Sequence, residues 1–131
     1  MTGLDTNVLV RYLTRDDEAQ FRAARRLLKR LERSGESAYI GVVVLCELSW
    51  VLTFSYGFDR ATLASTLGQI LQTVEFTLED RDLVREAVEE FASGRGGFAD
   101  YLIGFRNRKA GCHRTATFDR ALGESDRFLV L

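Results

Sequence analysis

Four acidic residues occupy positions where a carboxylate is chemically suggestive. Asp5 follows the short apolar start of the chain in "TGLDTNVLV", and Asp119 follows the run "HRTATF" in the same way. Asp100 lies just inside a helical pattern opened by "GGFAD", and Glu47 is the only charged residue in the segment 42–58. Four distant segments therefore each supply one acid that is a candidate for catalysis.

Each acid also has an ordinary structural explanation. Asp5 and Asp119 precede helical patterns, and either carboxylate would cap its helix by accepting a backbone N–H. Asp100 would complement the positive end of a helix dipole. Glu47 is harder to explain as a solvated or paired residue, because a buried carboxylate needs a cation and the neighbouring sequence offers none. Purely structural roles for all four require four separate coincidences of position.

Together, four carboxylates would predict a metal site. Two carboxylates about 4 Å apart repel each other by about 4 kcal/mol at an effective dielectric constant near 20. Four at one point therefore need either protons or a divalent cation among them. Oxygen ligands favour Mg²⁺ or Mn²⁺ over zinc, and Mg²⁺ both activates water and binds phosphate oxygens. The chemistry that this predicts is metal-assisted attack of water on a phosphodiester.

The elements that would position these acids alternate along the chain. Helical patterns occupy the segments 16–37, 43–57, 58–72, 77–94 and 98–111, with a helical turn at 119–125. Strand patterns occupy the apolar start and the segments 37–42, 73–77, 113–118 and 127–131. This order predicts a three-layer α/β/α fold with a central, mostly parallel sheet. Its right-handed crossovers bring the strand C-termini to one edge, where ligands of open parallel sheets bind.

Length and composition favour one soluble domain that covers residues 1–131. The chain is 46% hydrophobic and 28% charged, with a formal net charge of -1 at pH 7. This charge excludes a uniformly basic nucleic-acid binder but permits a local basic face. Two distant cysteines, no signal segment and no apolar run long enough to span a bilayer predict a cytoplasmic protein without membrane contact.

The motifs "LDTNVLV", "CEL", "FADYLIGFRNRKAG" and "TFDRAL", in this order, resemble those of the PIN-domain ribonucleases. The resemblance covers essentially the whole chain and is strongest to the VapC-type toxins of VapBC toxin–antitoxin pairs. It implies that Asp5, Glu47, Asp100 and Asp119 form the catalytic metal site. Asp5 and Asp100 would be the principal ligands of Mg²⁺ or Mn²⁺, and the other two would complete the site, hold a second ion or orient water.

The same resemblance implies supporting residues, an activity and partners. Thr6, Asn7 and Thr117 match the family's supporting polar positions, and we expect Asn7 to hydrogen-bond the carboxylates. The implied activity is an Mg²⁺-dependent endoribonuclease that leaves a 5′-phosphate and a 3′-hydroxyl. The chain would be the toxin of a type II toxin–antitoxin module. We expect a homodimer that also forms a hetero-oligomer with a cognate antitoxin, whose C-terminal segment covers the acidic crevice.

Basic side chains are concentrated on two of the expected helices. The segment 16–37 carries Arg22, Arg25, Arg26, Lys29, Arg30 and Arg33. These residues either form a solvated outer face or contact the RNA backbone or the antitoxin. Arg106, Arg108 and Lys109 lie on the same predicted helix as Asp100 and would guide single-stranded or looped RNA past the metal.

Two departures from the family pattern and two alternative functions stay open. Gly104 stands where alanine is common, which predicts a slightly weaker helix, and the glycines of "GRGGF" predict a mobile loop.

A haloacid-dehalogenase-like phosphatase also has an acid pair after its first strand, but Asn7 stands where its second aspartate is required. The other alternative is a catalytically degenerate domain that binds RNA or a protein partner, which the retention of all four acids disfavours.

Overall fold

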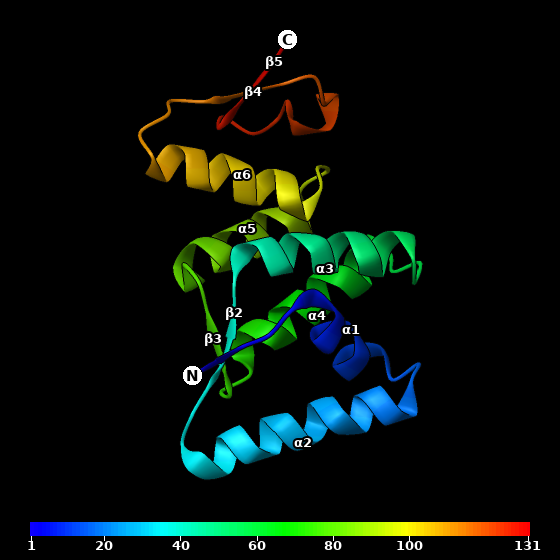
Figure 1. The fold of residues 1–131 in the computed structure, drawn as a ribbon. Coiled ribbons are helices and arrows are strands. Elements are labelled where there is room, and N and C mark those ends of the chain that lie inside the picture. Colours follow the sequence, from blue (N-terminus) through cyan, green and yellow to red (C-terminus); the bar gives the residue numbers. More distant parts are fainter. The chain divides into compact units, whose positions relative to one another are not determined.

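The computed structural model describes all residues of the chain, 1–131 (Figure 1). The six helices α1 to α6 are Thr6–Thr14, Glu18–Ser34, Val42–Phe54, Arg60–Gln72, Arg81–Ser93 and Phe98–Lys109. The strands β1 to β5 are Thr2–Gly3, Ala38–Ile40, Phe76–Leu78, Thr115–Thr117 and Phe128–Val130, and a 3₁₀ turn, η1, spans Arg120–Leu122. Helices and strands alternate as predicted, which confirms the α/β class. None of the helices combines the length and the hydrophobicity needed to cross a bilayer.

All the strand pairs are parallel, but the strands form two hydrogen-bonded sheets where the sequence predicts one. The first sheet has the order β1-β2-β3, with Thr2 opposite Ala38 and Ala38 opposite Phe76. The second consists of β4 and β5, with Thr115 opposite Phe128. Parallel pairing places the strand ends of each sheet at a common edge. The single edge that the sequence predicts for all strands stays a prediction, because β1 and β4 belong to different sheets.

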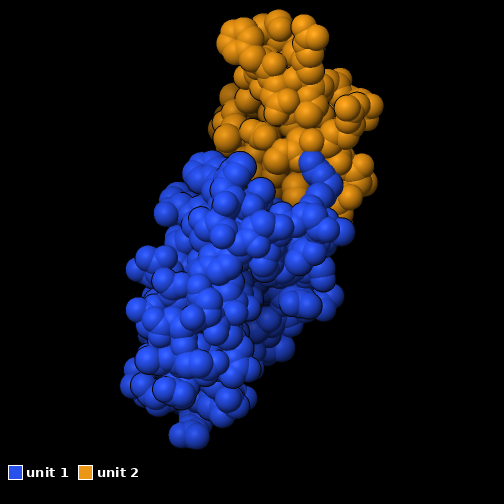
Figure 2. Space-filling view, turned by 90° about the vertical axis from the view of Figure 1, so that its right-hand side faces the viewer, with its two compact units in different colours: residues 1–81 blue, residues 82–131 orange.

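The chain divides into two compact units, residues 1–81 and residues 82–131, which are coloured separately in Figure 2. The first unit holds the three-stranded sheet and the helices α1 to α4, and the second holds α6, η1 and the two-stranded sheet. Asp5 and Glu47 therefore belong to the first unit, and Asp100 and Asp119 belong to the second.

The core of the first unit is built mainly from aliphatic side chains. Helix α1 packs against both α2 and α3. Leu9 on α1, Ile40 on β2, and Leu45 and Leu48 on α3 are all fully buried. Burial of such side chains is the main favourable contribution to folding, at about 25 cal/mol per Å² of apolar surface. These contacts fix the start of α1, and with it the position of Asp5.

Helix α3 buries only one side, although its sequence predicts packing on several sides. Leu45, Leu48 and Leu52 have no exposed area, whereas Trp50 and Phe54 are 53% and 82% exposed. Apolar residues stand on both faces of this helix, so the sequence lacks the periodicity that would have identified the buried face. The prediction of all-round packing was wrong for this helix.

The start of α3 depends on a residue from another element. Its N-cap residue is Gly41, which has no side chain to satisfy the first amides of the helix. Glu79, directly after β3, supplies the cap instead, because its carboxylate accepts a hydrogen bond from the Val42 N–H at 2.9 Å. Strand β3 thus completes a helix that begins 37 residues earlier.

Aromatic side chains fill the core of the second unit. Phe98 on α6 meets Phe91 on α5 edge to face, with 6.1 Å between ring centroids. Tyr101 meets Phe128 on β5 in the same way at 6.4 Å. Such pairs add about 0.5–1.5 kcal/mol beyond the burial of their area. The last strand is therefore fixed to α6, the helix that carries Asp100.

The glycine-rich stretch before Asp100 is a packed turn, although the sequence predicts a mobile loop. Gly96 is buried and its N–H donates a hydrogen bond to the Tyr101 hydroxyl at 3.0 Å. A Cβ atom at this position would overlap the side chain of Leu122. Glycine is therefore required here because helix α6 and η1 approach the backbone closely.

Candidate metal centre

Asp5 lies at the edge of the first sheet, immediately before α1. Its side chain is exposed, and its Oδ1 accepts a hydrogen bond from the Val8 N–H at 3.1 Å. Asp5 is therefore the N-cap of α1, which is the structural alternative that the sequence allows. The cap uses one carboxylate oxygen and holds the other at the carboxyl edge of β1.

A groove between α1 and α2 begins at Asp5. Its volume is about 380 Å³. Residues from the two helices line it: Asp5, Asn7, Val8, Arg11, Gln20, Ala23, Ala24 and Leu27. A cavity of this size and mixed lining is typical of a small-ligand site. Asp5, one of the two predicted metal ligands of the first unit, is thus part of the lining of this groove.

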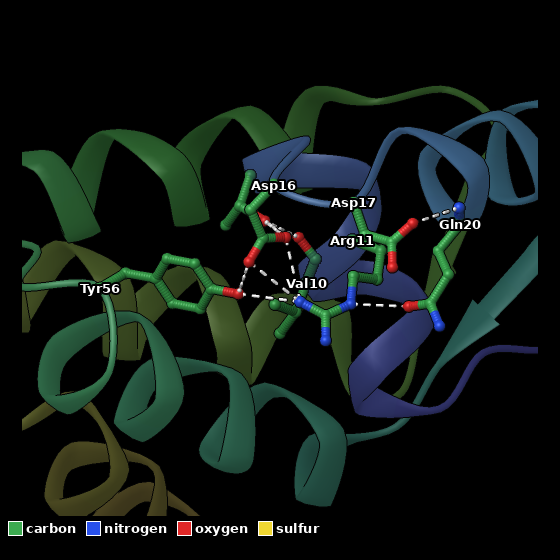
Figure 3. A network of polar contacts seen from close by, with 7 residues as sticks. Val10, Arg11, Asp16, Asp17, Gln20 and Tyr56 are labelled. Carbon is green, nitrogen blue, oxygen red and sulfur yellow. Dashed lines mark hydrogen bonds and ion pairs between the residues drawn. The ribbon is translucent and has the colours of Figure 1, made fainter.

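A polar network surrounds Arg11 and Gln20, two residues that line this groove (Figure 3). The Arg11 Nη1 lies 3.0 Å from each carboxylate oxygen of Asp16 and 3.1 Å from the Tyr56 hydroxyl. The Tyr56 hydroxyl donates to Asp16 at 2.6 Å, and the Arg11 Nε donates to the Gln20 Oε1 at 2.7 Å. Arg11 is therefore fixed by three side chains, although its own side chain is 31% exposed.

The network predicts how stability depends on pH. The hydrogen bond from Tyr56 lowers the pKa of Asp16, and Thr14 and Arg11 add to this effect. A carboxylate whose pKa is lowered by folding stabilises the protein at pH values above the ordinary aspartate pKa. This stabilisation is lost as the pH falls through the pKa of the folded state. We expect Asp16→Asn to unfold at lower urea concentration than the wild type at pH 7, with the difference shrinking toward pH 3. A difference that is constant over this range would contradict an ionic role for Asp16.

Glu47 does not occupy the buried position that the sequence predicts. It lies on α3 and its side chain is exposed. The buried face of α3 is formed by other residues, so the carboxylate reaches solvent and needs no cation to compensate for burial. The argument that burial makes Glu47 exceptional is therefore wrong. Its role as a metal ligand stays a prediction that rests on the motif.

Asp100 and Asp119 lie close to each other in the second unit. Asp100 is in the first turn of α6 and is partly buried, and burial is the main reason why its pKa is raised. The charge of Asp119 raises the pKa of Asp100 further, while the hydrogen bond from the Gly97 N–H opposes both effects. The structure thus brings together two of the four predicted acids from segments 19 residues apart.

Backbone amides hold the carboxylates of this pair. The Asp100 Oδ2 accepts from the Gly97 N–H at 3.1 Å, and the Asp119 Oδ1 accepts from the Ala121 N–H at 2.9 Å. Each bond occupies one oxygen, as it does at Asp5. Asp100 is partly buried, whereas Asp119 is exposed. Two neighbouring carboxylates that backbone amides hold in position fit a hard divalent cation such as Mg²⁺, which would offset their mutual repulsion.

The three predicted supporting residues have different surroundings. The Thr117 Oγ1 accepts a hydrogen bond from the Asp119 N–H at 3.0 Å, which fixes the turn that carries this acid. Thr6 is buried at the first position of α1. Asn7 lines the same groove as Asp5, without a hydrogen bond between their side chains. Thr117 therefore has the geometry of a positioning residue for its acid.

The structure contains no group of three or more histidine, cysteine, aspartate or glutamate side chains arranged around one metal position. Each unit holds two of the four acids. The assembly of Asp5, Glu47, Asp100 and Asp119 into one centre therefore stays a prediction.

Three residues of these surroundings were missed by the sequence analysis. Glu79 directly follows β3, and Asp5 and Asp119 each stand two residues after a strand. The absence of a capping side chain at Gly41 was a second available signal. Arg11 and Gln20 gave no such signal, because their contact depends on how α1 and α2 pack.

Comparison with known proteins agrees with the order of the motifs. A family model described as PIN domain matches residues 4–127, a range that includes parts of both units. The chain is 27% identical over 120 residues to the VapC ribonuclease of Aquifex aeolicus (strain VF5). This alignment covers 92% of the present chain and 88% of that protein. No solved structure gives a significant match.

Proposed function

The chain belongs to the PIN domain family, and on that premise we propose that it is a divalent-metal-dependent endoribonuclease. The relative from Aquifex aeolicus is named a VapC ribonuclease, which supports the choice of RNA as substrate. The observation that carries the proposal is the pair formed by Asp100 and Asp119, each held by a backbone amide. Burial raises the pKa of Asp100, and the charge of Asp119 raises it further. A carboxylate pair of this kind is costly unless it binds a cation.

In this proposal Asp5 and Asp100 hold Mg²⁺ or Mn²⁺, and Glu47 and Asp119 complete the centre. When bound, the cation lowers the pKa of water and neutralises charge on phosphate oxygens. Attack by water would form one O–P bond and break the bond from phosphorus to the 3′-oxygen. The attacking water would lose a proton to solvent and the 3′-oxygen would take one up, which leaves a 5′-phosphate and a 3′-hydroxyl. The amides of Val8, Gly97 and Ala121 hold the carboxylates in fixed orientations throughout.

Exposed basic side chains support binding of the RNA backbone. All six basic residues of α2 that the sequence analysis names are exposed. Arg106 and Arg108 are exposed on α6, the helix that carries Asp100. Arginine forms forked contacts with phosphate. An exposed strand of RNA is the substrate that such surfaces suit, because its phosphodiesters are accessible.

We further propose a biological setting in line with the named relative. The chain would act as the toxin of a type II toxin–antitoxin module in the cytoplasm, as one domain over residues 1–131. Its partners would be a second copy of itself and a cognate antitoxin that inhibits cleavage. A neighbouring gene for a small inhibitory protein would support this setting. Copurification of that protein with the chain would support it as well.

The decisive experiment compares two capping aspartates. Asp59 caps α4 as Asp5 caps α1, since the Asp59 Oδ1 accepts from the Thr62 N–H at 2.8 Å. Either change to alanine removes one cap, at a cost of about 1 kcal/mol in the free energy of unfolding. We expect Asp5→Ala to lose more than about a hundredfold in RNA cleavage, and Asp59→Ala to cleave like the wild type.

Cleavage is measured with labelled single-stranded RNA in Mg²⁺, with EDTA as the metal-free control. Wild-type cleavage that continues in EDTA would contradict the metal-dependent mechanism. Equal losses in the two variants would show that Asp5 acts only as a cap. Binding of RNA without cleavage under all metal conditions would favour the degenerate alternative.

A further inference from the structure

We propose that the groove between α1 and α2 receives one unpaired nucleobase of the RNA, next to the phosphodiester that is cut. This inference rests on the proposed function, because it places the reacting phosphate at Asp5. It assigns Gln20 and Arg11 to recognition of the substrate, a role that the four acids cannot fill.

The size and walls of the groove suit a flat ring. Its volume of about 380 Å³ lies within the range of small-ligand pockets, about 300–1,000 Å³. Ala23 and Leu27 on α2 supply apolar surface along one wall, and Val8 on α1 supplies it along the other. Nucleobases that leave a stacked strand are bound between apolar or aromatic side chains, with hydrogen bonds to the edge of the base.

The polar edge of the groove presents hydrogen-bond donors. The Arg11 Nε donates to the Gln20 Oε1 at 2.7 Å, and this bond fixes which end of the Gln20 amide is the oxygen. The Gln20 amide nitrogen therefore remains as a donor for a ligand in the groove. Nucleobases offer carbonyl oxygens and ring nitrogens as acceptors along their edges.

The charges around the groove favour a neutral base over a phosphate. The positive charge of Arg11 is compensated by Asp16, whose two carboxylate oxygens are each 3.0 Å from the Arg11 Nη1. Asp5 adds a negative charge at the other end. Binding of phosphate depends on cationic side chains that neutralise it, and here that positive charge is already paired.

The length of the groove fits one nucleotide. Asp5 and Arg11 are six residues apart at the start and near the end of α1. At 1.5 Å per residue this corresponds to roughly 9 Å along the helix. A phosphate near Asp5 therefore leaves room for its own base to reach Gln20.

Two substitutions test this inference, each with a matched control. Gln20→Glu keeps an acceptor for the Arg11 Nε but replaces the free donor by an acceptor, and Gln69→Glu makes the same change at an exposed position of α4. Ala23→Leu fills the groove, and Ala19→Leu adds the same bulk at an exposed position of α2 outside it.

The first readout is cleavage of single-stranded RNA in Mg²⁺, with the ends of the products sequenced. The wild type is expected to prefer one class of base at the position next to the cut. Both groove variants should weaken or change this preference and lower kcat/KM by about tenfold, mainly through KM. The two control variants should retain the preference and stay within about twofold of the wild type.

The second readout is binding without divalent metal, by anisotropy of a fluorescein-labelled single-stranded RNA. Ala23→Leu should weaken binding about fivefold or more, whereas Ala19→Leu should not.

If the wild type cleaves RNA and both groove variants match their controls, the groove holds no base and the inference fails, while the proposed nuclease stands. If the variants bind RNA normally but escape inhibition by an antitoxin, the groove receives a protein segment and the inference fails. If the wild type cleaves no RNA, the proposed function fails, and the inference fails with it because no phosphodiester is cut next to the groove.

Discussion

Asp100→Asn is expected to abolish RNA cleavage and to leave the metal-free protein at least as stable as the wild type. Asparagine keeps an oxygen that can accept the Gly97 N–H, but it removes the charge that a divalent cation needs. We expect a loss of more than about a hundredfold in cleavage rate. The gain in stability arises because burial and the charge of Asp119 both disfavour the ionised form of Asp100.

The same variant should change how stability depends on pH. Folding raises the pKa of Asp100, so the folded protein holds this proton more tightly than the unfolded chain does. Stability therefore falls as the pH rises from the ordinary aspartate pKa, about 3.9, through the folded-state pKa. Asparagine removes this fall. The difference in the free energy of unfolding between the wild type and Asp100→Asn would be measured by urea unfolding in EDTA at pH values from about 3.5 to about 7.

The matched control is Asp82→Asn, at an exposed acid in the first turn of α5. It should retain cleavage and show no comparable gain in stability toward neutral pH. If Asp100→Asn instead lost its fold together with its activity, Asp100 would be a structural acid. If it kept full activity, the proposed metal centre would be wrong.

Gly104→Ala is expected to destabilise the protein, although alanine is the better helix former. A Cβ atom at this position would lie 2.7 Å and 2.9 Å from two ring atoms of Phe128. This ring is buried and packs edge to face on Tyr101, so it has little freedom to move. Overpacking of this kind costs about 1–3 kcal/mol, which exceeds the roughly 1 kcal/mol that alanine contributes by helix propensity.

Gly68→Ala is the control for this prediction, because Gly68 lies inside α4 and has no atom within 4 Å of a Cβ built there. It should stabilise the protein by up to about 1 kcal/mol. Thermal unfolding of both variants, followed by circular dichroism, should therefore shift the midpoints in opposite directions. A higher midpoint for Gly104→Ala would contradict the close packing of Phe128 against α6.

Local patterns were enough to predict the order of the elements and the positions of three acids. Asp5 and Asp119 follow strands and precede helical turns, and Asp100 lies in the first turn of α6, as predicted. These features are set within a few residues of each acid. The expectation that strand ends share an edge concerned Asp5 and Asp119, which follow strands of different sheets, so it stays a prediction.

Features that depend on distant contacts were not predictable in this way. The sequence could not show which face of α3 is buried, so the exposure of Glu47 was missed. The glycines before Asp100 suggested mobility, because the close approach of Tyr101 and Leu122 is not encoded near them. The division of the strands into two sheets likewise depends on pairing between segments far apart in the chain.

The cap that Glu79 places on α3 has a consequence for the order of folding. Helices α1 and α2 begin with their own aspartate caps, so their first turns need only neighbouring residues. The acceptor for the Val42 amide lies 37 residues further along the chain, after α4 and β3, so it reaches this amide only when β3 is in place. Closing so long a loop has an entropic cost that slows folding. The first turn of α3 should therefore acquire full protection from hydrogen exchange only when β3 docks, later than the starts of α1 and α2.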